Sequence, residues 1–208
     1  MESGGLSASV RLPLFPLQTV LFPEATVPLH IFEPRYREMV GRCLEHDEPF
    51  GIALLLEEEA EAPVPNRVGT EAAIIASRRY PDGRYDVVVE GRRRFEIRRL
   101  DRSRKLLWAE VEFLPETLGR GAEETARAVA ALAAGVVESL EVKGHPIVDE
   151  TWHDLDPRAL SYRVASILPA GDDVKQKLLE ASDAATRLRQ EAKLLMSIRR
   201  IDADAGAA

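Results

Sequence analysis

Five prolines punctuate an apolar stretch near the N-terminus, which reads LPLFPLQTVLFPEATVPLHIFEPRY over residues 12–36. A proline inside a helix removes a backbone donor and clashes with the preceding turn, and it pushes the residue before it toward extended geometry. The stretch is therefore predicted to be extended, with short strands at 10–15 and 26–31 and a tight turn through Pro23 and Glu24. The same prolines interrupt any run of about 20 apolar residues that could span a membrane.

The next segments carry one helical pattern and then several strand patterns. Apolar residues at helical spacing follow Pro34, which suits a first helical turn: Tyr36, Met39, Val40, Cys43 and Leu44. A continuous apolar run at 50–59 predicts a central strand, and the prolines of 60–67 predict a loop.

Residues 70–114 are predicted to be consecutive strands. Two of them meet at Pro81-Asp82-Gly83, a strong hairpin signal because glycine tolerates a positive φ. Gly91 interrupts the second strand and predicts a bulge or bend, and 105–114 alternates like a half-buried strand.

From Pro115 onward the period becomes helical. A stripe runs from Val129 to Leu140, a second helix opens at Asp156-Pro157, and two more follow before a polar tail. A β-rich first half and an all-helical second half predict an α+β architecture.

Composition restricts the classes of function. The net charge of −7 over 208 residues argues against general nucleic-acid binding. A single cysteine, Cys43, excludes an internal disulfide framework and a cysteine-based zinc site. The N-terminus lacks the pattern of a secretory signal, so we expect a cytoplasmic protein that does not enter membranes.

Several blocks, in order, resemble the Lon N-terminal domain family, the substrate-binding domain of ATP-dependent Lon proteases. They are LPLFPL (12–17), VLFPEATVPLHIFEPRY (20–36), PFGIALL (49–55), VGTEAAI (68–74), DGRYDVVVEGRRRFEI (82–97) and WAEVEFLPE (108–116). The resemblance implies a PUA-like β-barrel at 8–116 and a helical subdomain at 122–201 packed on it, together one domain of the Lon N-terminal type.

The family's catalytic parts have no counterpart in this sequence. A phosphate-binding loop needs a Gly-Lys pair, which occurs nowhere in the chain. The resemblance therefore implies a free-standing, non-catalytic recognition module that binds unfolded or damaged polypeptide in an apolar groove and takes part in protein quality control. A protease or chaperone system is the partner class it suggests, and self-association stays open.

The candidate polypeptide-binding residues are the aromatics of the proline-rich stretch and its helix: Phe15, Phe22, Phe32 and Tyr36. We expect no cofactor and no metal site, although polar residues cluster at 145–156. His30 is predicted to be structural, because neither a paired carboxylate nor a nucleophile is recognisable near it in the sequence.

An RNA-binding function is the alternative. The segment 78–105 holds eleven Arg or Lys residues against five Asp or Glu, a net charge of +6 in an acidic chain. Such a basic hairpin could attract phosphates, with Arg92, Arg93 and Arg94 as candidate contacts. Few aromatics stand between the arginines, so the platform on which single-stranded bases stack is thin.

Overall fold

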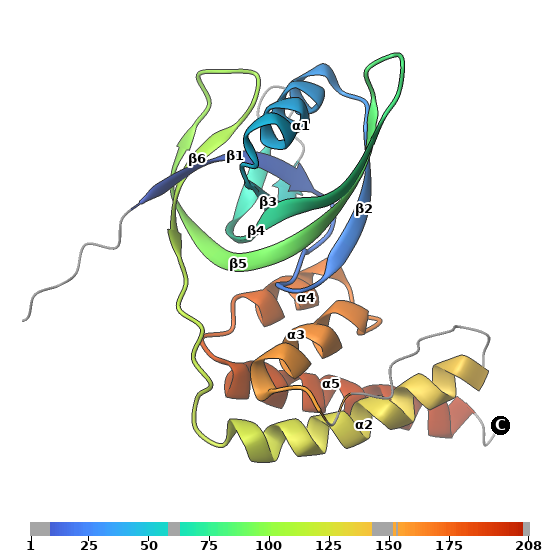
Figure 1. The fold of residues 1–208 in the computed structure, drawn as a ribbon. Coiled ribbons are helices and arrows are strands. Elements are labelled where there is room, and N and C mark those ends of the chain that lie inside the picture. The colour runs from blue at the N-terminus through green and yellow to red at the C-terminus, as the bar shows by residue number, and fades with distance from the viewer. Residues whose placement is uncertain (1–8, 58–62, 143–151, 153, 206–208) are drawn as a thin grey trace, which may run out of the picture. The chain divides into compact units, whose positions relative to one another are not determined.

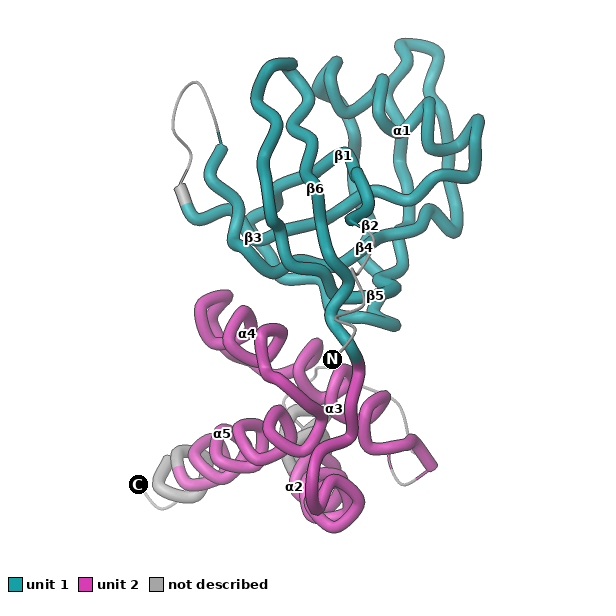
Figure 2. Tube along the Cα trace, turned by 90° about the vertical axis from the view of Figure 1, so that its left-hand side faces the viewer, with its two compact units in different colours: residues 1–115 teal, residues 116–208 magenta. Residues whose placement is uncertain are grey.

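The computed structural model describes residues 9–57, 63–142, 152 and 154–205 (Figure 1). The chain divides into two compact units, Met1–Pro115 and Glu116–Ala208 (Figure 2). All the strands of the described residues belong to the first unit, together with one helix, and the second unit is helical. The α+β organisation predicted from the change of period is confirmed.

The first unit is a small barrel. Its elements are β1 (Val10–Leu17), β2 (Thr26–Ile31), α1 (Pro34–His46), β3 (Phe50–Glu57), β4 (Val64–Arg79), β5 (Tyr85–Asp101) and β6 (Trp108–Phe113). The strand order is β2-β5-β4-β3-β1-β6, and β6 also pairs with β5. The ring from β5 through β4, β3, β1 and β6 is therefore closed, and β2 is added at its side along β5.

The proline-rich stretch forms the strands predicted for it. β1 pairs in parallel with β3 and antiparallel with β6, and β2 pairs antiparallel with β5. Between them the amide of Ala25 donates to the carbonyl of Phe22 at 3.2 Å, closing the turn that contains Pro23. Glu24 has a φ of 65°, the conformation that a type II turn needs at its third position.

Gly91 marks a bulge in β5, as its sequence context predicts. The register between β4 and β5 shifts between Thr70 and Ala72, whose partners are Arg94 and Gly91. Gly91 also lies against the turn before β2, where its amide donates to Ala25 and its carbonyl accepts from Glu24. A β-carbon at position 91 would stand 2.2 Å from the Phe22 carbonyl oxygen, so this close approach requires glycine.

Two local predictions are wrong. The segment 60–67 is not entirely loop, because β4 begins at Val64. Pro65 is accommodated in that strand because the pairing of β3 with β4 is irregular there, and irregular pairing is where a strand tolerates proline. Leu44, expected on the buried face of α1, is exposed, whereas Tyr36, Met39, Val40 and Cys43 are buried as predicted.

The helical unit contains α2 (Ala122–Val142), α3 (Pro157–Ile167), α4 (Asp172–Leu179) and α5 (Ala184–Ala205). The Asp156 side chain caps α3 by accepting from the amides of Arg158 and Ala159. Polar side chains lie inside the unit: the Arg187 guanidinium donates to Ser161 Oγ at 2.7 Å and to the Tyr162 hydroxyl at 3.1 Å. Within the described residues, we find no helix with the length and apolar character required to cross a bilayer.

Candidate functional site

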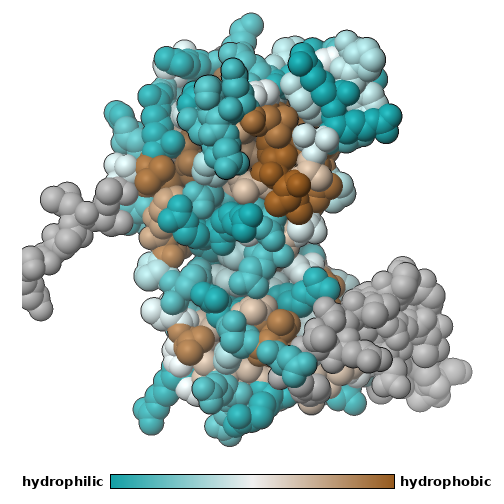
Figure 3. Space-filling view, in the orientation of Figure 1, coloured by the Kyte–Doolittle hydropathy of each residue, from teal (hydrophilic) through white to brown (hydrophobic). Residues whose placement is uncertain are grey.

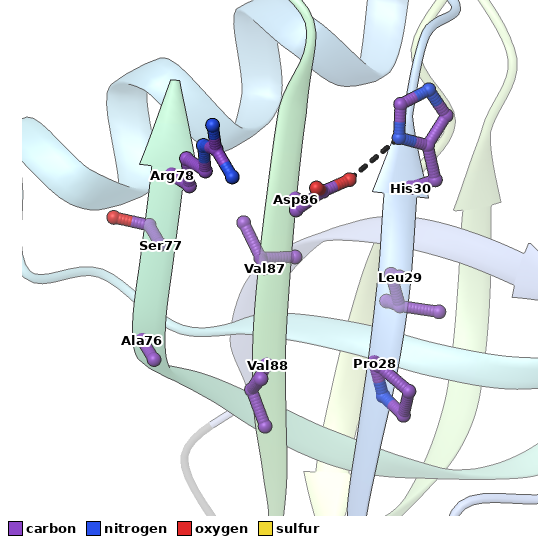
Figure 4. Close-up of a pocket in the computed structure, with 9 residues that line it drawn as sticks. All are labelled: Pro28, Leu29, His30, Ala76, Ser77, Arg78, Asp86, Val87 and Val88. Atoms are coloured by element: carbon purple, nitrogen blue, oxygen red, sulfur yellow. Dashed lines mark hydrogen bonds and ion pairs between the residues drawn. The ribbon is translucent and has the colours of Figure 1, made fainter. Parts of the chain in front are cut away.

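A shallow groove lies on the outer face of three neighbouring strands of the barrel unit, β2, β5 and β4 (Figure 4). Its volume is about 530 Å³, within the range of ligand sites in proteins. The residues that line it are Pro28, Leu29 and His30 from β2, Ala76, Ser77 and Arg78 from β4, and Asp86, Val87 and Val88 from β5.

Cross-strand pairing arranges the outward side chains of this groove in two rows. Pro28 pairs with Val88, which pairs with Ala76, and these three form the apolar row. Two positions along each strand, His30 pairs with Asp86, which pairs with Arg78, and these form the polar row. Residues two apart on a strand point to the same face, and Figure 4 shows the two rows lying one above the other across the three strands. Pro28, His30, Ala76 and Arg78 are exposed, so this face is the outer one.

The polar row contains a hydrogen-bonded cluster around Asp86. His30 Nδ1 lies 2.6 Å from Asp86 Oδ1, and the Tyr80 hydroxyl donates to the other carboxylate oxygen. These two hydrogen bonds, from His30 first and Tyr80 second, lower the pKa of Asp86 below its ordinary value. An ionised carboxylate only accepts, so His30 Nδ1 is the donor in this hydrogen bond. The other ring nitrogen, Nε2, lies 3.4 Å from Arg84 Nη1.

Exposed apolar side chains continue next to the groove. Phe32, one residue beyond β2, is 61% exposed, and its ring stacks beside that of His30 with the centroids 6.2 Å apart. Ile75, which precedes Ala76 on β4, is 50% exposed. Figure 3 shows that apolar side chains reach the surface of the barrel unit in patches set among hydrophilic ones.

The four aromatic residues predicted to bind polypeptide divide between core and surface. Phe15, Phe22 and Tyr36 are buried, and the rings of Phe15 and Tyr36 pack with centroids 4.2 Å apart. Such rings fill the barrel core and offer no surface to a partner in this structure. Phe32 alone among the four is exposed, so a binding role for this set can only be carried by Phe32.

The three arginines predicted as an RNA-binding set are likewise separated by the bulge at Gly91. Arg94 is 1% exposed, with its Nη2 atom 3.4 Å from the Pro115 carbonyl oxygen. Arg93 donates two hydrogen bonds to Glu71, at 2.9 and 3.0 Å, and lies over the Phe113 ring. Arg92 forms an ion pair with Glu90 at 2.7 Å.

Other arginines of the basic hairpin are also in ion pairs. Arg98 bridges Glu96 and Glu112, each at 2.7 Å, and Arg99 pairs with Glu110. Carboxylates on the same and neighbouring strands therefore neutralise much of the charge that the sequence concentrates in this segment. The RNA-binding alternative gains no support from this arrangement.

The sequence interpretation missed the two rows of the groove. His30 was predicted to be structural, but it is exposed, and its hydrogen-bond partner Asp86 lies 56 positions away. The available signal was the period of two in VPLHI and YDVVVE, which places Pro28 with His30 and Asp86 with Val88. That signal shows which residues share a face but not which strands are neighbours.

No group of three or more potential metal ligands occurs within the described residues. Of the polar cluster predicted at 145–156, His145, Asp149, Glu150 and His153 lie outside the described residues, while Asp156 caps α3. Cys43 is buried, and that burial raises the pKa of its thiol to about 11, far from the range of a reactive thiolate.

The groove has the geometry of a binding surface: an apolar row, a polar row and an exposed aromatic ring on one sheet. Comparison with known proteins identifies the family to which this fold belongs. Residues 11–197 match the family described as the ATP-dependent protease La (LON) substrate-binding domain. The chain therefore belongs to the Lon substrate-binding domain family.

Individual relatives agree with this assignment. The Lon protease of Escherichia coli strain K12 is 29% identical over 191 residues, which cover 88% of this chain and 24% of that protein. Lon protease 2 of Sorangium cellulosum is 30% identical, over 86% of this chain and 23% of that protein. The chain thus spans about a quarter of the length of the curated relatives it matches.

Solved structures show the same fold. A crystal structure of a Lon N-terminal domain protein from Xanthomonas campestris has 30% sequence identity and a TM-score of 0.65, and covers 87% of this chain and 96% of that one. The N-terminal domain of a Mycobacterium avium complex Lon protease has a TM-score of 0.72 at 22% identity, over 90% of this chain and 98% of that one. The predicted family and its α+β fold are confirmed.

Proposed function

We propose that the chain is a polypeptide-recognition module that binds exposed apolar segments of unfolded or damaged proteins in the groove on β2, β5 and β4. Membership of the Lon substrate-binding domain family supports the general role in substrate recognition. The proposed position of the binding site rests on the apolar row of Pro28, Val88 and Ala76, which borders a hollow of about 530 Å³.

The chemistry of the row suits an unfolded chain. Unfolded proteins differ from folded ones mainly in the apolar side chains they expose, and contiguous apolar surface on a soluble domain marks a site of interaction. Pro28 and Ala76 are exposed and Val88 is half-buried, so an apolar side chain placed over them would lose contact with water. Phe32, whose ring stacks beside His30, and Ile75, which precedes Ala76 on β4, add exposed apolar side chains near the groove.

The edge of β2 is a poorer binding site than the face. β2 pairs with β5 on one side and lies at the end of the strand order, so its other edge could in principle accept an additional strand. Pro28 stands in the middle of that edge and has no N–H to donate. We therefore place the bound chain on the outer face of the sheet, held by its side chains, and not at the edge of β2.

The proposed module does no chemistry on the chain it binds. We expect it to neither hydrolyse ATP nor cleave polypeptide by itself, and to work with a protease or chaperone system that acts on the bound chain. Its own contribution is affinity for exposed apolar segments.

The experiment is a binding assay with a purified protein kept unfolded by reduced and blocked cysteines, and with the native form of the same protein as the reference. Val88→Asp places a charge in the apolar row and should weaken binding of the unfolded form by at least about tenfold, because an unpaired charge is costly in an apolar contact. Leu44→Asp makes the same change at an exposed apolar position of α1 and serves as the control.

Binding of the unfolded form should survive in the Leu44→Asp control and be weak for the native protein. Equal binding by wild type and Val88→Asp, both with unchanged circular dichroism, would remove the groove from the proposal. Equal affinity for native and unfolded protein would remove the proposed function itself.

A further inference from the structure

We propose that the groove selects extended segments in which an acidic side chain stands two positions from an apolar one. This inference rests on the function proposed above and specifies its substrate class. It follows from three features of the outer face: the spacing of its two rows, the hydrogen bonds already made by Asp86, and the open donors of Arg78.

The spacing of the rows matches an extended peptide. The apolar and polar rows are two residues apart on β2, β5 and β4 alike: Pro28 and His30, Val88 and Asp86, Ala76 and Arg78. Two residues of a strand span about 6.6–6.8 Å, and side chains two apart point to the same side. An extended peptide that runs along the strands has the same repeat, so a side chain over the apolar row places the side chain two positions away over the polar row.

The polar row has an acceptor that is already in use. Both oxygens of the Asp86 carboxylate take hydrogen bonds, one from His30 Nδ1 and one from the Tyr80 hydroxyl. Arg78, its cross-strand neighbour, further lowers the pKa of Asp86 through its charge. The carboxylate is therefore held in its charged form by the protein's own donors, which reduces its attraction for a cation from a ligand.

The donors of the polar row are less occupied. The Arg78 guanidinium lies over the Tyr80 ring, 5.2 Å from its centroid, and within the described chain no carboxylate lies inside the 4.0 Å distance of an ion pair with it. A guanidinium has five N–H donors in a planar fork that fits a carboxylate. Arg84 adds a second positive charge beside His30, although Asp82 already pairs with it. Arg78, at the β4 end of the row, therefore complements an anionic oxygen group.

The carboxylate we assign is that of a side chain within the peptide. A peptide that lies along the strands presents side chains to both rows at once. The two-residue spacing of the rows matches the spacing of the side chains on one face of the peptide. The alternative is that the C-terminal carboxylate of a peptide binds the polar row. Its position relative to the last side chain differs from that of a Glu or Asp carboxylate, and the experiment distinguishes the two.

The test uses nine-residue peptides with acetylated and amidated ends, a Thr/Ser host sequence and a fluorophore. One peptide carries Leu-Thr-Glu, a second carries the same residues as Leu-Glu-Thr, and further peptides replace the Glu of the first with Gln or Lys. A last peptide has Gln in place of Glu and a free C-terminal carboxylate. Fluorescence anisotropy gives the dissociation constants for wild type, Arg78→Gln, Val88→Asp and the control Arg102→Gln, whose arginine is exposed in the turn before β6.

We expect the Leu-Thr-Glu peptide to bind about fivefold more tightly than the Leu-Glu-Thr and Gln peptides, the upper range for an exposed ion pair. Arg78→Gln should abolish that preference while Arg102→Gln keeps it, and Val88→Asp should weaken all peptides. Binding that Val88→Asp abolishes, but with equal affinity for Leu-Thr-Glu and Leu-Glu-Thr, overturns this inference and leaves the proposed function intact.

The remaining outcomes are equally decisive. If the Lys peptide binds more tightly than the Leu-Thr-Glu peptide, Asp86 is the group that selects the ligand. If the peptide with a free C-terminus binds as tightly as the Leu-Thr-Glu peptide, and only when Arg78 is present, the recognised carboxylate is the one at the chain end. Either result overturns the assignment to an acidic side chain. Binding of all peptides that is the same in wild type and Val88→Asp, or no binding of any, contradicts the proposed function as well.

Discussion

Phe22 and Phe32 stand ten residues apart in one apolar stretch and have opposite environments. Phe22 is 1% exposed in the core of the barrel unit, whereas Phe32 is 61% exposed beside His30. We expect Phe22→Ala to lower the free energy of unfolding by about 3–5 kcal/mol, the cost of emptying a buried ring, and Phe32→Ala to change it by less than about 0.5 kcal/mol. Urea denaturation measures both.

The same two variants separate stability from binding. Phe32→Ala should reduce affinity for an unfolded protein at unchanged stability, because its ring extends the exposed apolar surface of the groove. An unchanged affinity would confine the binding surface to the groove itself. A Phe22→Ala variant as stable as wild type would contradict the core described here.

Glu191 in α5 is a buried acid, and neither of its carboxylate oxygens has a hydrogen-bond partner among the described residues. Burial raises its pKa well above the ordinary 4.5, although the charge of Arg187 opposes this shift. The folded chain thus holds this proton more tightly than the unfolded chain. The stability that the group contributes is fully present below pH 4.5 and is lost as the pH rises toward the raised pKa.

Glu191→Gln keeps the shape of the side chain and removes its titration. We expect the free energy of unfolding of wild type, relative to that of Glu191→Gln, to fall steadily as the pH rises above 4.5. Guanidinium denaturation at a series of pH values gives this difference. A difference that does not change with pH would mean that Glu191 ionises in the folded chain without cost.

At the scale of elements, the bulge of β5 and the turn before β2 depend on one another. The amide and carbonyl of Gly91 hold both sides of that turn, and a β-carbon at position 91 would meet the Phe22 carbonyl oxygen at 2.2 Å. We therefore expect Gly91→Ala to cost about 1–3 kcal/mol in the free energy of unfolding. Gly121→Ala serves as a comparison, because a β-carbon at position 121 would have no atom within 4 Å. Gly121 has a φ of 75°, so this variant measures the cost of backbone strain without a steric clash.

How much of these elements the sequence predicts depends on how local their causes are. Proline and glycine act on their own backbone, so the early strands, the turn at Pro23 and the bulge at Gly91 could be predicted. The start of β4 at Val64 could not, because Pro65 is tolerated there only through its irregular pairing with β3. The rows of the groove depend on pairs such as His30 with Asp86 and Val88 with Ala76, which the order of strands decides and local patterns do not.

In the whole molecule, the segment between β6 and α2 is hydrogen-bonded on both sides of the unit boundary at Pro115. The amide of Leu114 donates to the Arg94 carbonyl in the barrel unit, and Glu116 accepts from the Tyr162 hydroxyl in the helical unit. Pro115, between them, has a restricted φ. We propose on this basis that the two units unfold together, although each has its own buried side chains.

The two tryptophans make this expectation measurable, because Trp108 lies in β6 and the buried Trp152 lies in the helical unit. Trp108→Phe and Trp152→Phe each leave one reporter. We expect the fluorescence transition of each variant in urea to coincide with its own transition by circular dichroism. Fluorescence and circular dichroism midpoints that differ clearly within one variant would show that the units unfold independently.

Binding of unfolded polypeptide to the outer face of β2, β5 and β4 can be detected by placing a photoreactive benzoylphenylalanine at position 76. Ala76 is exposed in the apolar row, and Leu44, exposed on α1, provides the control position. After irradiation with one purified unfolded protein, we expect a covalent adduct from position 76, little from position 44, and loss of the position-76 adduct when an excess of apolar peptide competes. Equal adducts from both positions, or an adduct that the peptide does not prevent, would mean that unfolded polypeptide does not bind at this face.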